Sequence, residues 1–295
     1  MTRNVPRENA CLACGARQRR SFTYRGFDYY RCIRCGLVST LPFPAPEQIE
    51  EHYKKRFADG NYQLLLSDRS RYSRVYADFV GVLEALLSRS GESLAGKTVL
   101  DIGCFAGDLL AMLRDRGADV WGVELQADAV AIANRQLPGR VLQSDVYCTE
   151  FPVMQFDIVT FTGLIEHLLD PARFLARVHA LVRPGGLILL QTPDSGSLLA
   201  RVLRKFWPPY APVEHIHLFT RRGIRLLLEA NGFRILDTRS HWKKLPVSYV
   251  YNMLQNFGPE FHRLLKPLYS VLPRFVRNAV LPFYIGEMIV VAARV

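Results

Sequence analysis

Four cysteines near the start of the chain have the spacing of a metal site. They form two pairs, Cys11 with Cys14 and Cys32 with Cys35, with 17 residues between the pairs, inside the range typical of four-cysteine zinc sites. A glycine follows each pair and allows the tight turn that points backbone amides at a ligating sulfur. Four thiolates bind zinc as a closed tetrahedron with no open position for catalysis. We therefore predict a structural zinc ribbon, and a redox dithiol pair or a disulfide is the alternative.

A glycine turn follows the first long apolar run of the middle region. Gly103 and Gly107 come directly after Asp101, and they allow a ligand to reach backbone amides at the start of a helix. The fingerprint of a nicotinamide site would require glycine at two further positions, where Phe105 and Asp108 stand. The turn therefore predicts a nucleoside ligand other than NAD.

Two more acidic residues end the next two apolar runs. Glu124 lies 23 residues after Asp101, where a carboxylate can accept hydrogen bonds from both hydroxyls of a ribose. Asp145 ends the third apolar run, where a carboxylate can accept a hydrogen bond from the amino group of adenine. Acidic residues at three successive strand ends predict one nucleoside site.

Two histidines preceded by glutamates are candidate bases. His167 follows the fourth predicted strand, and Glu214-His215 lies just before a helix cap at Thr220. A neutral imidazole with a reference pKa near 6.5 suits proton abstraction. We predict His215 as the general base with Glu214 beside it, whereas His167 suits a catalytic or a structural role equally. His217 is interpreted as a loop histidine bonded to a carbonyl.

The motifs of this middle region resemble those of the class I S-adenosylmethionine-dependent methyltransferases. Residues 101–107 read D-I-G-C-F-A-G and are similar to the first motif of that family, D-x-G-x-G-x-G, with Phe105 in place of the central glycine. Glu124 matches the ribose-binding acid of the family and Asp145 the acid that contacts adenine. The resemblance covers about residues 97–240 and the last strand. It implies methyl transfer from S-adenosylmethionine.

A second resemblance concerns the segment 214–220, E-H-I-H-L-F-T. It is similar to the E-H-x-x-x-F-[ST] segment of zinc-ribbon sugar C-methyltransferases, in which a Glu-His pair deprotonates a keto-sugar. The resemblance implies catalytic roles for Glu214 and His215. The chain lacks the long C-terminal half of that subfamily, so the acceptor stays open.

The elements that must position these residues alternate between strand and helix. Such alternation predicts an α/β fold with a doubly wound, mostly parallel sheet, and the family resemblance implies seven strands, the last of them antiparallel. Strands are predicted at 97–102, 118–123, 140–143, 156–161, 187–191, 233–238 and 288–292, and helices at 47–57, 72–87, 108–116, 127–137, 172–182 and 221–230. We predict three parts: a zinc ribbon at 1–41, a linker with helices at 42–96, and a methyltransferase domain at 97–295.

Composition and charge exclude several classes of protein. Hydrophobic residues make up 49% of the 295 residues, which excludes a mostly disordered chain. Residues 97–200 carry a net charge of 8 − 12 = −4 between two basic flanks, which argues against a uniformly basic nucleic-acid binder. The first residues contain no apolar signal segment, and 280–295 is too short and too interrupted to cross a bilayer. We therefore expect a cytoplasmic protein.

The stretch 241–286 interrupts the last two predicted strands and is rich in aromatic and basic residues. A basic amphipathic insert of this kind can bind phosphate groups or lie on an anionic membrane. The alternative is a helical lid that packs its aromatic side chains on the sheet.

These observations favour an enzyme that methylates oxygen or carbon of a small anionic or glycosylated metabolite. The first alternative is an RNA or protein methyltransferase that docks through the zinc ribbon and the basic flanks. Residues 160–165 lack the Pro-Pro-aromatic segment of enzymes that grip a flipped base, which disfavours methylation of exocyclic amines. A non-catalytic binding protein is the second alternative, and the intact Asp101, Glu124 and Asp145 argue against it.

Overall fold

A seven-stranded sheet forms the centre of the computed structural model, which describes residues 10–45, 47–49, 51–52, 69–153, 155–257 and 259–295. The strands lie in the order β10-β11-β8-β7-β4-β5-β6. Their bounds are β4 Thr98–Ile102, β5 Asp119–Glu124, β6 Val141–Gln143, β7 Phe156–Thr162, β8 Val182–Pro193, β10 Phe233–Pro246 and β11 Val280–Arg294. Strand β11 is antiparallel to both β10 and β8, and the other neighbouring pairs are parallel. The predicted fold class is confirmed.

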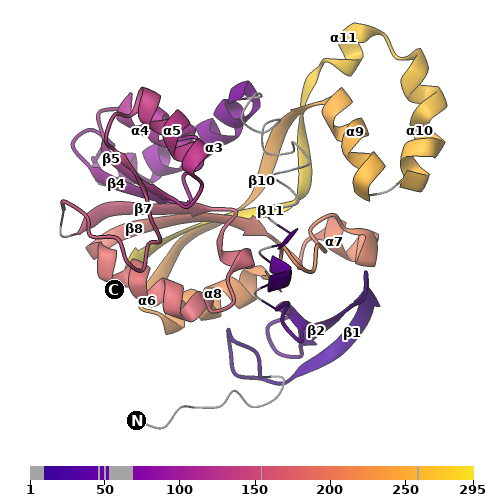
Figure 1. Cartoon of the computed structure of the whole chain (residues 1–295), viewed down its shortest axis with the longest axis horizontal. Helices are drawn as coiled ribbons and strands as arrows, with labels where there is room; N and C mark the ends of the chain where they lie inside the picture. The colour runs from indigo at the N-terminus through magenta and orange to yellow at the C-terminus, as the bar shows by residue number, and fades with distance from the viewer. Residues whose placement is uncertain (1–9, 46, 50, 53–68, 154, 258) are drawn as a thin grey trace.

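Helices cover both faces of this sheet (Figure 1). One face carries α3 Arg69–Leu87, α4 Asp108–Arg114 and α5 Ala127–Gln136, and the other carries α6 Pro171–Leu181 and α8 Arg221–Ala230. The side chains of Asp170 and Thr220 cap α6 and α8 by accepting backbone N–H groups. The predicted helix at 72–87 lies inside α3, whereas the one at 47–57 extends beyond the described residues.

The predicted turn around Pro184 lies inside strand β8 instead of between two elements. The pairing of β7 with β8 passes from Phe156↔Val182 to Ile158↔Leu187, so residues 183–186 bulge out of the ladder. Helix α6 accordingly ends one residue earlier than predicted.

The N-terminal cysteine region forms a second, four-stranded sheet. It contains β1 Gln18–Tyr24, β2 Phe27–Cys32, β3 Val38–Leu41 and, at its edge, β9 His217–Leu218. Strands β1 and β2 pair as an antiparallel hairpin. Strand β9 comes from the segment between α7 (Leu198–Leu203) and α8, so the ribbon is joined to the larger domain by sheet hydrogen bonds.

The last two strands extend beyond the sheet as a two-stranded ribbon (Figure 1). Their pairing continues to Pro246↔Val280, so both strands are longer than predicted and the interrupting helices occupy only 247–279. These helices are α9 Val247–Phe257, α10 Pro259–Val271 and α11 Arg274–Arg277. They stand at the far end of the ribbon, away from the sheet, and this position does not fit the alternative of a helical lid on the sheet.

Candidate active site

The glycine turn after β4 adopts the conformation that its sequence predicts. Gly103 and Gly107 have φ values of 74° and 75°, a region that favours glycine. Gly107 also lacks space, since a Cβ there would lie 3.1 Å from the Cβ of Ala133. Phe105 has a φ of 49°, so this side chain occupies a left-handed conformation at the position where the resembling family has glycine.

Glu124, at the end of β5, holds this turn in place. One carboxylate oxygen accepts the backbone N–H of Phe105 at 3.0 Å. The other accepts the N–H groups of Leu125 at 2.8 Å and Gln126 at 3.0 Å. A carboxylate has about four lone-pair positions, so the Glu124 carboxylate can accept a further hydrogen bond beside the turn.

Asp101 and Asp145 complete the acidic edge predicted from the sequence. Because β4, β5 and β6 are parallel neighbours, the three acids lie at one edge of the sheet. Asp101 is buried and accepts the Thr160 hydroxyl at 2.7 Å. Burial, together with the charge of Glu124, raises the pKa of Asp101 to about 7. Asp145 is exposed and accepts the N–H of Tyr147.

The structure brings His167 and His215 together. Their ring centroids are 4.9 Å apart. The Nδ1 atom of His167 lies 2.7 Å from the backbone oxygen of Glu214, and that of His215 lies 2.7 Å from the oxygen of Pro209. Since a carbonyl only accepts hydrogen bonds, each Nδ1 carries a proton, and the neutral ring has its lone pair on Nε2. Both rings thus present the atom that suits a base or a metal ligand.

Glu166 joins these two histidines and was missed as a site residue. Its carboxylate is buried, accepts the Thr192 hydroxyl at 3.0 Å, and lies 3.9 Å from Nε2 of His167. Burial raises the pKa of Glu166 to about 8. The ligand atoms of Glu166, His167 and His215 all lie within 4.8 Å of one another. The glutamate's place directly after an apolar strand was the available signal.

Glu214 contacts histidines through both its side chain and its backbone. Its Oε2 lies 3.8 Å from Nε2 of His52. Glu214 acts on the histidine pair through its backbone oxygen, which accepts from His167. The structure therefore adds the Glu166 carboxylate to the predicted residues His167, His215 and Glu214.

A second cluster of charges, from the β10–β11 pair, was absent from the sequence prediction. Glu287 accepts Lys243 Nζ at 2.7 Å and lies 3.3 Å from Nδ1 of His241. Burial alone would raise the pKa of Glu287, but Lys243 and His241 lower it to about 2. The cluster neighbours the histidine pair, because Glu287 pairs across the sheet with Pro193, next to Thr192.

Comparison with known proteins decides the family. A family model described as a methyltransferase domain matches residues 69–238, more than half of the chain. The chain belongs to this methyltransferase-domain family. In the described residues, no helix has the length and apolar character that crossing a membrane requires.

Its curated relatives include enzymes named ubiquinone biosynthesis O-methyltransferase. The chain is 40% identical over 106 residues to the protein of Pseudomonas paraeruginosa, a match that covers 34% of this chain and 45% of the relative. It is 33% identical over 170 residues to that of Coxiella burnetii, covering 52% and 70%. The chain thus spans less than half the length of the first of these relatives.

Solved structures share the methyltransferase fold. A Burkholderia thailandensis 1,6-didemethyltoxoflavin-N1-methyltransferase with bound S-adenosylhomocysteine matches with a TM-score of 0.53 at 17% identity, covering 93% of this chain and 98% of that one. A magnesium protoporphyrin IX methyltransferase from Synechocystis matches with a TM-score of 0.50 at 19% identity, covering 75% and 84%. These likenesses concern the fold alone.

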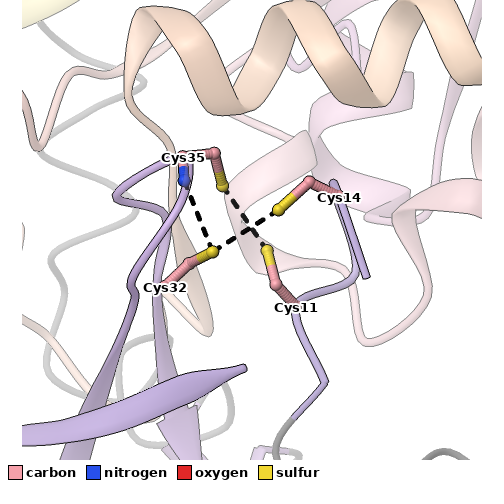
Figure 2. Close-up of side chains that lie close together, drawn as sticks. All are labelled: Cys11, Cys14, Cys32 and Cys35. Atoms are coloured by element: carbon pink, nitrogen blue, oxygen red, sulfur yellow. Dashed lines mark hydrogen bonds between the residues drawn. The ribbon is translucent and has the colours of Figure 1, made fainter. Parts of the chain in front are cut away.

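The four cysteines of the methyltransferase converge as a metal site would require (Figure 2). The Sγ atoms of Cys11 and Cys35 are 3.5 Å apart, and those of Cys14 and Cys32 are 3.4 Å apart. Two thiolates on one tetrahedral zinc would be about 3.8 Å apart. The cysteines are free, in contrast to the disulfide alternative. Backbone amides of residues 34 and 35 also point at Cys32 Sγ, so the residues fit zinc.

The cysteine ribbon is bonded to the segment that carries the candidate base. The N–H of Thr40 donates to the oxygen of Ile216 at 3.0 Å, and the N–H of Ile216 donates to the oxygen of Glu166 at 2.9 Å. His217 lies in β9 instead of a loop, buried, with Nδ1 at 3.0 Å from the Ser39 hydroxyl. Burial lowers the pKa of His217 to about 4, which identifies it as a neutral packing residue.

A cavity of about 280 Å³ lies elsewhere in the methyltransferase. Its lining includes Lys97, Asp157 and Arg183, at or beside the amino ends of β4, β7 and β8. It contains none of the predicted site residues, which lie at the carboxyl ends of the strands, where ligands bind in such sheets.

Proposed function

We propose that this methyltransferase methylates an oxygen or carbon atom of a small anionic or glycosylated metabolite, with His215 as the general base. The observation that carries the proposal is the histidine pair, in which backbone carbonyls orient both rings beside the buried Glu166. The O-methyltransferase names of the relatives favour oxygen as the acceptor atom.

The acidic edge is proposed to hold the cofactor. Glu124 would accept the ribose hydroxyls, Asp145 the adenine amino group, and the Gly103–Gly107 turn would offer its amides, with Asp101 supporting that turn. When bound, S-adenosylmethionine supplies an activated methyl group on a sulfonium. Transfer then depends mainly on alignment with the acceptor atom.

Proton removal is the task left to the protein. A hydroxyl, or a carbon next to a ketone, must lose its proton as the methyl group arrives. Nε2 of His215 would take this proton, while Pro209 keeps the ring orientation through Nδ1. The carboxylate form of Glu166, within 4.8 Å, would stabilise the charged imidazole that forms when His215 takes the proton.

The cysteine cluster is proposed to hold one structural zinc ion through Cys11, Cys14, Cys32 and Cys35. The sulfur spacing and the amides aimed at Cys32 support this assignment. A closed four-sulfur site stabilises its own module and takes no part in methyl transfer.

The test measures binding and turnover separately. Calorimetry gives the affinity for S-adenosylmethionine, and transfer of a tritiated methyl group is followed into 3,4-dihydroxybenzoate and into a panel of nucleotide-linked keto-sugars. His215→Ala should lower turnover by roughly 10²–10⁴-fold, the usual contribution of a general base, with cofactor affinity unchanged. His167→Ala should have a smaller effect.

Three outcomes would contradict the proposal. Full turnover in His215→Ala with loss in His167→Ala would reverse the two roles. Full turnover in both variants would mean that alignment alone suffices. Methyl transfer into RNA or protein, but into no small molecule, would favour the alternative substrate classes.

A further inference from the structure

The three helices at the end of the β10–β11 ribbon, residues 247–279, form a module of their own. Helix α10 packs on α9, where the rings of Tyr251 and Tyr269 stack at 3.7 Å. The Arg277 guanidinium donates to the oxygens of Ser270 and Leu272 and lies 5.1 Å from the Tyr269 ring. These contacts pack the helices against one another and hold the module together.

That outer side is apolar. Leu264, Leu268 and Val271 recur at helical spacing on α10, and Phe275 follows on α11. They are 74%, 61%, 75% and 77% exposed, values unusual for large apolar side chains in such a tight series. The module therefore presents an apolar stripe to its surroundings.

Basic side chains accompany the stripe. Arg263, Lys266 and Arg274 are exposed, and Glu260 is the only acidic residue that the sequence has between 247 and 279. This combination of exposed apolar residues with Lys and Arg is the signature of a helix that lies in a membrane interface. With 13 residues, α10 is about 20 Å long, too short to cross the bilayer.

A second surface of the same kind lies at α7. Leu198, Val202 and Phe206 are exposed at four-residue spacing. They alternate with the exposed Arg201, Arg204 and Lys205. Figure 1 shows α7 on the same side of the molecule as the module. Two separate elements on this side of the molecule thus carry exposed apolar side chains together with exposed Lys and Arg.

We propose that the stripe on α10 and α11, with its basic residues, binds the surface of an anionic phospholipid bilayer. A second copy of the chain fits less well, because a two-fold contact would place this basic surface against itself. An anionic bilayer complements both the apolar stripe and the basic side chains. Apolar side chains enter the acyl boundary, and the Lys and Arg side chains reach the headgroups. The inference is independent of the proposed acceptor.

Vesicle flotation of the full chain tests the inference. We expect binding to vesicles of phosphatidylcholine with 30% phosphatidylglycerol, and at least tenfold weaker binding to phosphatidylcholine alone or in 0.5 M salt. Leu264→Ser combined with Phe275→Ser should lower binding at least tenfold. Val295→Ser is the matched control, because Val295 is 73% exposed and lies at the distant C-terminus. Unchanged binding of S-adenosylmethionine reports that each variant is folded.

Several results would overturn the inference. The first is that the wild-type chain floats with neither kind of vesicle. The second is that Val295→Ser lowers vesicle binding as much as the double variant does. The third is that the double variant binds vesicles as well as the wild-type chain. Sedimentation that shows a dimer, dissociated by the double variant, would assign the stripe to a second copy of the chain. Lys266→Glu with Arg274→Glu should abolish the preference for phosphatidylglycerol, and a retained preference would contradict the electrostatic part.

Discussion

Replacement of Cys32 by serine is expected to slow methyl transfer without weakening cofactor binding. Cys32 belongs to the proposed zinc site, and the ribbon that this site stabilises is bonded to the segment of His215. Besides the pairing of β3 with β9, three hydrogen bonds connect the two parts, namely Thr40 N–H to Ile216 O, Ser39 with His217, and Thr220 Oγ1 to Cys35 O. Asp101, Glu124 and Asp145 lie at the ends of strands that do not pair with the ribbon.

The magnitude follows from these bonds. Each of the three named bonds contributes about 1 kcal/mol net, so their loss alone removes about 3 kcal/mol that holds the segment in place, and loss of the β3–β9 pairing adds to it. Since 1.36 kcal/mol corresponds to a factor of ten, the productive position becomes about a hundredfold less favoured. We expect kcat to fall by about 10- to 100-fold while the Kd for S-adenosylmethionine changes less than about twofold.

The assay combines elemental analysis for zinc, calorimetry and turnover on the purified full chain. Cys148→Ser is the matched control, because Cys148 is an exposed thiol outside the cluster. Ser39→Ala keeps all four cysteines and removes one of the three bonds, so it should lose about fivefold in kcat with zinc retained. Zinc loss in Cys32→Ser with full kcat would refute the coupling, and wild-type protein without zinc would refute the site.

Three further predictions concern the acidic residues. Glu124→Gln should weaken S-adenosylmethionine binding at least tenfold by calorimetry. Glu124→Ala should also lower the Tm, because three backbone N–H groups lose their acceptor. Wild-type affinity in either variant would contradict the ribose assignment. Because burial raises the pKa of Asp101 from 3.8 to about 7, its native form holds the proton more tightly than the unfolded chain. Its contribution to stability is therefore present below pH 4 and is lost as the pH rises to about 7. Asp101→Asn should accordingly flatten the fall in the free energy of unfolding, measured with denaturant, over that pH interval. An unchanged dependence on pH would argue against a protonated Asp101. Chelation by EDTA that leaves the zinc content of the protein unchanged should leave turnover unchanged if His215 acts as a base. Loss of turnover that Mn²⁺ restores, and that is absent in Glu166→Gln, would instead make Glu166, His167 and His215 metal ligands.

Sequence patterns were sufficient where the relevant geometry is local or follows from strand direction. The cysteine spacing predicted the cluster, since each pair lies within one short turn. The acidic edge was predictable as well, because parallel neighbouring strands end at the same side of a sheet. Asp101, Glu124 and Asp145 needed no knowledge of side-chain contacts to be placed together.

Tertiary structure decided what depends on pairing between distant segments. Ser39 meets His217 across 178 residues, and Lys243 meets Glu287 across 44, through strand registers that no local pattern specifies. The surroundings of Glu214 show the same limit, because its carboxylate lies 3.8 Å from Nε2 of His52, a residue far away along the chain. The continuation of β10 and β11 beyond the sheet likewise follows from their mutual pairing. That pairing carries the basic aromatic helices away from the sheet, a position that composition alone left open.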